Sequence, residues 1–307
     1  MRTPPRPVAP TPDARGLIQL IEEMAQAGAT DLHLKVPGRP QVRIDGALIP
    51  MPHERLSAET TFGFARGVME LAGEPEPFAS VRDARVAFAV PGLGRFRAQV
   101  ARQRGTFELV LHKVCSDAPT LGDYPGLDPV VTALEGPPGL FLVGGGRHRR
   151  GVIAAIIRQF NENHWGRLVS IEDPVDWLHR DARAAISQRE VGTDVYTFHE
   201  GLSGAMRQDA DAIAVSDMPT PEDADAVLRA AEEGLHLFAG LPVGDASDAV
   251  MAFVGRFPAA REREVASRVA SILRGVAVVN SSASVIWQDI DATRRDLLRA
   301  GQLRLAG

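Results

Sequence analysis

A glycine-rich turn stands between two apolar segments in the middle of this chain. Residues 140–143 have the apolar run of a short buried strand, and residues 152–163 have the spacing of a helix. The turn carries four glycines: Gly144, Gly145, Gly146 and Gly151. A P-loop has this strand–turn–helix arrangement, because the backbone N–H groups of its turn bind phosphates. The spacing therefore predicts a turn of the phosphate-binding type at residues 144–151.

Two groups that a working P-loop needs do not follow this turn. A lysine contacts the outer phosphates and a hydroxyl binds magnesium, but Gly151 is followed by Val152 and Ile153. Arg149 and Arg150 supply positive charge at the start of the helix, where anions are favoured. An arginine is larger than a lysine and prefers forked contacts. We expect a solvated basic turn, with residual phosphate binding through these arginines as the alternative.

The composition is that of an ordinary soluble globular protein. The 307 residues carry a formal net charge of −5 and are 45% hydrophobic, so no global basic field indicates binding to nucleic acid. The single cysteine, Cys115, excludes an intrachain disulfide and a cysteine-based zinc site. No segment approaches the roughly 18–20 apolar residues that span a bilayer, and the N-terminus lacks the apolar core of a secretory signal. We expect a cytoplasmic protein without a metal site.

The elements before the turn are those of a separate small domain. Residues 1–14 are rich in proline and are expected to form a disordered tail. Residues 15–115 combine helical and alternating patterns, which predicts a small α+β domain with antiparallel strands. The helices are expected near residues 17–24 and 58–71, and the strands near residues 32–36, 42–44, 84–90, 95–103 and 107–114.

The elements around and after the turn have a different pattern of apolar residues. Residues 116–138 are rich in proline and glycine, which is typical of a linker, with one short helix near residues 129–135. Residues 139–307 alternate apolar runs with helical patterns, which predicts a parallel sheet in an α/β domain. The runs lie at 140–143, 168–171, 212–215 and 235–241, and the helical patterns at 152–163, 199–208, 222–233, 259–275 and 291–303. In such a sheet, ligands bind at the carboxyl ends of the strands, where the glycine-rich turn lies.

Seven short motifs occur in the order and at the spacing of a known family. They are ATDLHL at 29–34, VRIDG at 42–46, RFR at 95–97, SIEDPVD at 170–176, QREVG at 188–192, AMRQDAD at 205–211 and FP at 257–258. Together they make the chain resemble the PilT/GspE superfamily of secretion ATPases, in particular the type IV pilus retraction ATPases. The resemblance extends over nearly the whole chain.

The resemblance implies a two-domain protomer. A PAS-like α+β domain precedes a RecA-like α/β domain with the P-loop NTPase fold, and six protomers form a ring. ATP and magnesium bind between domains and neighbours, and hydrolysis acts on a pilus platform protein of the inner membrane. The implied location is the cytoplasm, peripheral to the inner face of the membrane.

The same comparison assigns roles to two carboxylates. Glu172 falls on the glutamate that activates water in the family, although it could merely shape a strand end. Asp217 stands where the family has a glutamate that binds magnesium through water. Pro219 stands at a family arginine and Pro242 at a family histidine, and His236 is expected to be a packed strand residue instead of its replacement.

The apolar pattern is intact, whereas four cooperating parts of the catalytic site are changed. We therefore expect a non-catalytic paralogue of the retraction ATPase that forms a homo-oligomer or joins a ring of an active PilT-like ATPase. No cofactor is expected, apart from ATP and magnesium if residual binding survives. The alternatives are a divergent active ATPase that powers pilus retraction or secretion, and a repurposed cytoplasmic binding module.

Overall fold

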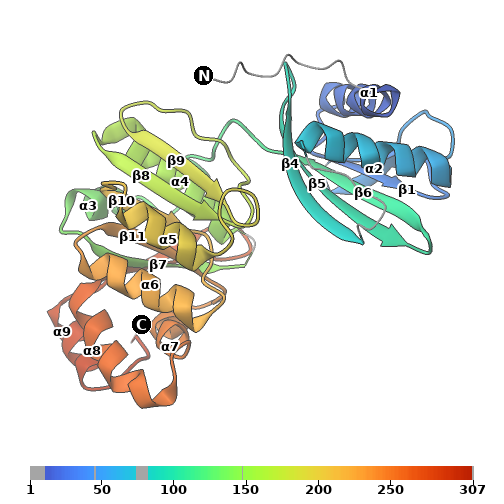
Figure 1. Cartoon of the computed structure of the whole chain (residues 1–307). Helices are drawn as coiled ribbons and strands as arrows, with labels where there is room; N and C mark the ends of the chain where they lie inside the picture. The colour runs from blue at the N-terminus through green and yellow to red at the C-terminus, as the bar shows by residue number, and fades with distance from the viewer. Residues whose placement is uncertain (1–10, 45, 74–81, 147, 306–307) are drawn as a thin grey trace, which may run out of the picture. The chain divides into compact units, whose positions relative to one another are not determined.

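The computed structural model describes residues 11–44, 46–73, 82–146 and 148–305. The chain divides into two units, residues 1–115 and residues 116–307 (Figure 1). Residues 1–10 of the expected tail lie outside the described residues. The predicted tail extends to residue 14, but helix α1 begins at Pro12. The prediction is therefore wrong for residues 12–14. The Thr11 hydroxyl caps this helix by accepting a hydrogen bond from the Ala14 N–H.

The first unit is an antiparallel sheet with two helices on one face (Figure 1). Its strands are in the order β3-β2-β1-β6-β5-β4. Phe96, Ala98 and Val100 alternate along β5 and are buried in the core that α1 and α2 cover. The elements are α1 (Pro12–Gln26), β1 (Asp31–Lys35), β2 (Gln41–Ile44), β3 (Ala47–Pro50), α2 (Ala58–Ala72), β4 (Asp83–Val90), β5 (Gly94–Gln103) and β6 (Thr106–Lys113). The predicted α+β architecture is confirmed.

The second unit begins with the segment predicted to be a linker. This segment is packed instead, because Tyr124, Leu127, Val130 and Leu134 belong to the core of the unit. The expected short helix is confirmed as α3 (Pro129–Glu135), and a 3-10 turn, η2 (Leu121–Asp123), precedes it. Proline and glycine mark turns here, but the apolar residues between them are spaced for burial.

A seven-stranded sheet forms the centre of the second unit, in the order β13-β12-β7-β11-β10-β8-β9. All neighbouring strands are parallel except β12 and β13, so the predicted parallel sheet is confirmed. The strands are β7 (Gly139–Gly145), β8 (Arg167–Glu172), β9 (Ala185–Glu190), β10 (Ala212–Val215), β11 (His236–Leu241), β12 (Leu273–Val279) and β13 (Val285–Asp289). The helices are α4 (Arg149–Asn163), α5 (Phe198–Met206), α6 (Pro221–Glu232), α7 (Ala246–Val254), α8 (Glu262–Ile272) and α9 (Ala292–Arg299), with a 3-10 turn η3 (Ala259–Arg261) before α8.

Helices cover both faces of this sheet. Leu140 and Leu142 of β7 belong to the core beneath α5 to α9, whereas Phe141 and Val143 belong to the core beneath α3 and α4. The alternation follows from the pleat, which points successive side chains to opposite faces. Both faces are therefore apolar, and polar groups gather at the ends of the strands.

The boundary between α8 and β12 differs from the prediction. The helical pattern at residues 259–275 crosses Ile272, where α8 ends, and Leu273, where β12 begins. No glycine or proline separates the two elements, so the apolar pattern continues across the boundary. The sequence also gives no prediction for β9, β13 and α7.

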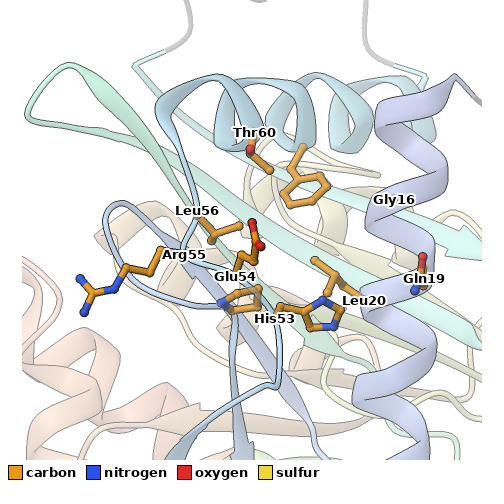
Figure 2. Close-up of a pocket in the computed structure, with 10 residues that line it drawn as sticks. Gly16, Gln19, Leu20, His53, Glu54, Arg55, Leu56 and Thr60 are labelled. Carbon is orange, nitrogen blue, oxygen red and sulfur yellow. The ribbon is translucent and has the colours of Figure 1, made fainter.

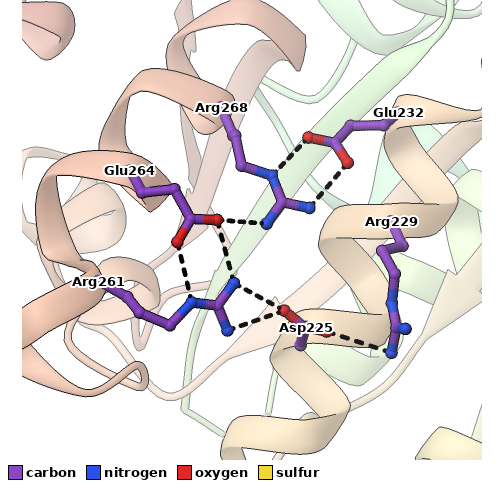
Figure 3. A network of polar contacts seen from close by, with 6 residues as sticks. All are labelled: Asp225, Arg229, Glu232, Arg261, Glu264 and Arg268. Carbon is purple, nitrogen blue, oxygen red and sulfur yellow. Dashed lines mark hydrogen bonds and ion pairs between the residues drawn. The ribbon is translucent and has the colours of Figure 1, made fainter.

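A network of ion pairs joins α6 to η3 and α8 (Figure 3). Arg268 binds Glu232 with two parallel contacts, 2.7 Å from Nε to Oε1 and 2.8 Å from Nη2 to Oε2. Arg261 bridges Asp225 at 3.2 Å and Glu264 at 3.0 Å. The forked contact of Arg268 with Glu232 thus joins α8 to α6 by two charged hydrogen bonds.

Candidate functional site

The carboxyl ends of β7, β8, β10 and β11 meet at one edge of the sheet, here called the carboxyl edge. All the site residues predicted from the sequence lie there. The glycine-rich turn follows β7, Glu172 ends β8, and Asp217 follows β10. Because β8 and β10 are neighbours, both carboxylates belong to the same part of this edge.

The first two glycines of the turn are fixed by packing. A Cβ atom on Gly144 would lie 2.7 Å from methyl carbons of both Val243 and Val278. Gly145 has a φ of 125°, a backbone conformation that residues with a side chain rarely adopt. Its N–H donates to the Val243 carbonyl oxygen over 2.6 Å. That N–H is therefore engaged within the protein. Gly146 is exposed, with open space around it.

Gly151 lies in the first turn of α4 and faces a tyrosine. A Cβ atom at this position would lie 1.8 Å from the hydroxyl oxygen of Tyr124. Tyr124 is buried in the segment before α3, and burial raises the pKa of its hydroxyl. This contact was not predicted, since the proline-rich segment was expected to be a linker.

Arg149 forms an ion pair with Asp217 across the carboxyl edge. Its Nη2 atom lies 2.6 Å from Oδ2 of Asp217, and its Nε donates to the Ser216 carbonyl oxygen over 3.3 Å. The Arg149 side chain is only 15% exposed, so it differs from the solvated side chain predicted. Burial lowers the pKa of Arg149, and the charge of Asp217 opposes that effect. The other oxygen of Asp217, Oδ1, accepts the N–H of Met218 over 2.8 Å.

Arg150 contacts the segment after β8. Its Nε lies 3.0 Å from Oδ2 of Asp176, and its Nη1 donates to the Asp173 carbonyl oxygen over 3.2 Å. Two cations at the N-terminus of α4 oppose the helix dipole. The carboxylates of Asp176 and Asp217 offset this cost.

Glu172 is buried, with a side chain held by polar neighbours. Its Oε1 accepts hydrogen bonds from the Ser170 hydroxyl over 2.6 Å and from Nε2 of Gln188 over 3.0 Å. Burial raises the pKa of Glu172 to about 7, and the two hydrogen bonds oppose the rise. A carboxyl group with this pKa exchanges a proton near neutral pH, which is a property of general bases.

Ser216 ties the two strand ends together. Its hydroxyl oxygen accepts the N–H of Asp173 over 3.0 Å, and its own N–H donates to the Ile171 carbonyl oxygen over 3.0 Å. The sequence reasoning missed this role. A small hydroxyl residue directly after a buried strand was the available signal.

His236 and Pro242 lie at opposite ends of β11. His236 begins the strand, away from the carboxyl edge, and stacks on Phe141 with ring centroids 6.2 Å apart. Burial lowers its pKa. The prediction that His236 is a packed strand residue is confirmed. Pro242 directly follows β11 and brings no titratable group to the edge.

The first unit has a cavity of about 340 Å³ between α1, α2 and the loop before α2 (Figure 2). Leu20 and Leu56 form part of its apolar wall, and Arg55 extends away from the two helices (Figure 2). Nε2 of His53 at its rim lies 2.5 Å from Oε2 of Glu23, and this hydrogen bond lowers the pKa of Glu23. None of the predicted site residues lines this cavity.

The described part of the chain has neither a metal cluster nor a membrane-spanning helix. No three His, Cys, Asp or Glu side chains gather there closely enough to hold a metal ion. Each described helix is too short or too polar to cross a bilayer.

Comparison with known proteins identifies relatives over most of the chain, although no protein-family model matches it. The type IV pilus ATPase PilU of Pseudomonas aeruginosa is 28% identical over 249 residues, which cover 80% of this chain and 65% of PilU. The match therefore spans just under two thirds of PilU. The type IV pilus retraction ATPase PilT of the same organism is 28% identical over 269 residues, which cover 85% of this chain and 76% of PilT.

Solved structures agree with this relationship. The pilus retraction motor PilT with bound ADP superposes with a TM-score of 0.84 at 28% identity, covering 93% of this chain and 86% of PilT. The ATPase DotB of Legionella pneumophila has a TM-score of 0.77 at 17% identity, covering 97% of this chain and 88% of DotB, and shows the same fold. The predicted RecA-like fold of the second unit is thereby confirmed. The chain is therefore a homologue, over most of its length, of the type IV pilus ATPases PilU and PilT.

Proposed function

We propose that this protein is a non-catalytic paralogue of the type IV pilus retraction ATPases, with a structural or regulatory role in pilus retraction and twitching motility. The ion pair between Arg149 and Asp217 carries the proposal. It neutralises, within one chain, the arginine that begins α4 and the acid expected to bind magnesium.

The residues at the turn do not fit a magnesium–nucleotide complex. In P-loop NTPases, a lysine, a metal-binding hydroxyl and a metal-binding acid act together on the phosphates. Here the first turn of α4 offers Arg149, Arg150 and Gly151, with neither a lysine nor a hydroxyl. Both oxygens of Asp217 already accept hydrogen bonds, and the N–H of Gly145 already donates one.

The proposed role is exerted in a ring. PilT is a retraction motor and was solved with ADP, and the conserved fold of this chain supports assembly in a related way. The ring contains either copies of this chain alone or copies mixed with an active PilT-like ATPase. It works in the cytoplasm, at the inner face of the membrane, where it acts indirectly on the pilus platform protein.

A divergent active ATPase is the second candidate. The observation that favours it is Glu172, whose pKa of about 7 suits a general base. Arg149 or Arg150 would then take the place of the lysine, with Asp217 released from its ion pair to bind magnesium.

Thermal unfolding and ATP hydrolysis of the purified protein distinguish the two candidates. We expect neither a shift of Tm with Mg-ATP nor hydrolysis, whereas a ligand at 100 times its Kd would stabilise the protein by about 2.7 kcal/mol. Hydrolysis that disappears in Glu172→Gln and persists in Glu135→Gln, purified in the same way, would overturn the proposal. Glu135 is the matched control because it is exposed and lies on α3.

Mixing experiments test the role in a ring. The protein is combined with an active PilT-like ATPase, and co-elution and the ATPase rate are measured against the mixing ratio. We expect a mixed oligomer or a homo-oligomer. A monomer that neither co-elutes nor changes the rate, and that captures no pilus component, would favour the repurposed binding module.

A further inference from the structure

A cavity of about 420 Å³ lies at the edge of the second unit's sheet opposite the carboxyl edge. It is formed where β7 and β12 begin and where the antiparallel β13 ends, with α3 and α9 as its walls. The glycine-rich turn follows the other end of β7, so the two sites are separated by the length of the strand. The volume lies within the range of about 300–1,000 Å³ that is usual for small-molecule sites.

Two arginines of this cavity lack acidic partners. Arg274 of β12 and Arg295 of α9 both line it, and the Nε atom of each is buried without a hydrogen-bond partner among the described residues. Nη1 of Arg274 donates only to the carbonyl oxygens of Ser271 and Leu273. Within the described ranges, neither guanidinium group lies within 4.0 Å of a carboxylate oxygen. Both side chains are only partly buried, so their outer guanidinium nitrogens can donate to an acceptor in the cavity.

Two carboxylates, Asp289 and Asp291, also line the cavity, and each is engaged with another group. Asp291 caps α9 by accepting the N–H of Arg294 over 2.8 Å, and its second oxygen lies 3.5 Å from Nη1 of Arg294. Asp289 accepts the indole N–H of Trp287 over 2.8 Å. Among the described residues, neither carboxylate forms an ion pair with Arg274 or Arg295.

The fold holds Arg274 in place although the positive charge of Arg295 repels it. Gly139 is required by the backbone, because a Cβ atom there would lie 2.3 Å from the Ile272 carbonyl oxygen; the Arg274 side chain packs over the same position, with Cγ 3.0 Å and Nε 3.1 Å from that Cβ. Burial lowers the pKa of Arg274, and the charge of Arg295 adds to that effect. A pair of like charges is costly unless an anion joins it.

We propose that this cavity binds a small phosphate monoester through Arg274 and Arg295. A monoester carries about −1.5 to −2 charges at pH 7, which matches two guanidinium groups, whereas a single carboxylate would neutralise only one. Guanidinium groups bind phosphate oxygens with forked hydrogen bonds. Pro129, Ala133 and Ile290 add apolar wall for the organic part of the ligand. This proposal does not depend on the proposed function.

Phenyl phosphate and inorganic phosphate are the probes, each titrated at constant ionic strength and followed by calorimetry and thermal unfolding. We expect phenyl phosphate to bind more tightly than inorganic phosphate. Arg274→Gln and Arg295→Gln should each raise its Kd by about tenfold to a hundredfold, because each removes charged hydrogen bonds. Arg299→Gln, on the same helix but paired with Asp296, should leave the Kd unchanged.

Unfolding in phosphate-free buffer separates a binding role from a structural one. There Arg295→Gln should have the Tm of the wild type or a higher one, because the substitution removes the repulsion. A lower Tm for Arg295→Gln together with an unchanged response to phenyl phosphate overturns the proposal. Equal affinity for the two probes overturns the assignment to an ester, and loss of binding in Arg149→Gln places the anion at the glycine-rich turn instead.

Discussion

The Nη2 atom of Arg149 lies 2.6 Å from Oδ2 of Asp217, and the two residues are 68 positions apart in the chain. The contact joins the first turn of α4 to the segment after β10. At this edge a P-loop protein would place a bound nucleotide and its metal ion. In this protein, two side chains already balance each other's charge there.

Replacement of Arg149 should destabilise the protein, because Asp217 then loses its partner. We expect Arg149→Gln to lower the free energy of unfolding by about 1–3 kcal/mol, because Asp217 loses a charged hydrogen bond in a partly buried place. Urea unfolding at pH 7 measures the change. Arg299→Gln is the control, since its ion pair with Asp296 is exposed and should contribute at most about 1 kcal/mol. An equal loss in both variants would contradict the prediction.

The buried carboxyl group of Glu172 should make stability depend on pH. Its pKa is raised from 4.5 to about 7 in the folded state, so the native protein binds the extra proton between these values. Stability therefore falls as pH rises from about 4.5 to 7, by roughly 3 kcal/mol at most. Glu172→Gln should be more stable than the wild type at pH 8 and similar at pH 4.5. Glu135→Gln, at an exposed position, should show no such difference. A stability difference between Glu172→Gln and the wild type that does not change with pH would contradict the argument.

A side chain at position 151 should conflict with Tyr124. Gly151→Ala places a carbon on the tyrosine hydroxyl, and overpacking of this kind costs about 1–3 kcal/mol. In a Tyr124→Phe background the cost should shrink, because the oxygen at 1.8 Å is gone while the ring carbon at 2.9 Å stays. A double-mutant cycle by urea unfolding measures the coupling. Additive effects would show that the two residues do not interact.

The ion pairs between α6 and α8 should respond to salt. Arg268→Gln removes the forked contact with Glu232 and should cost about 0.5–1 kcal/mol at low ionic strength. Most of this loss should disappear in 1 M NaCl, where the screening length is about 3 Å. Arg229→Gln is the control, because Arg229 is 54% exposed and has a single contact with Asp225 in Figure 3. An Arg268 effect that is independent of salt would indicate lost packing instead of lost charge.

The sequence predicts most of the fold because local patterns agree with the tertiary structure. The run at 212–215 is apolar throughout and forms β10 with the predicted bounds. The prediction fails where the pattern crosses a boundary without a turn residue, as between Ile272 and Leu273. It also fails at residues 116–138. The many prolines there predicted a linker, but four apolar residues between them are buried.

The candidate site is predictable in position but not in its contacts. The carboxyl edge follows from strand order, so the glycine-rich turn, Glu172 and Asp217 are expected to lie there. The pairing of Arg149 with Asp217 and of Arg150 with Asp176 depends on side-chain reach between distant segments. No local pattern encodes that reach. The contact of Tyr124 with Gly151 escapes prediction for the same reason.

The contact between Tyr124 and Gly151 also restricts which substitutions the chain can accept at position 151. Because the Tyr124 hydroxyl fills the space beside Gly151, a side chain gained there first would have to push the tyrosine out of the core. Replacement of Tyr124 has to come first, and by itself it removes a buried aromatic group. A side chain at position 151 therefore needs two substitutions, the first of them unfavourable, and the contact with Tyr124 keeps this position a glycine.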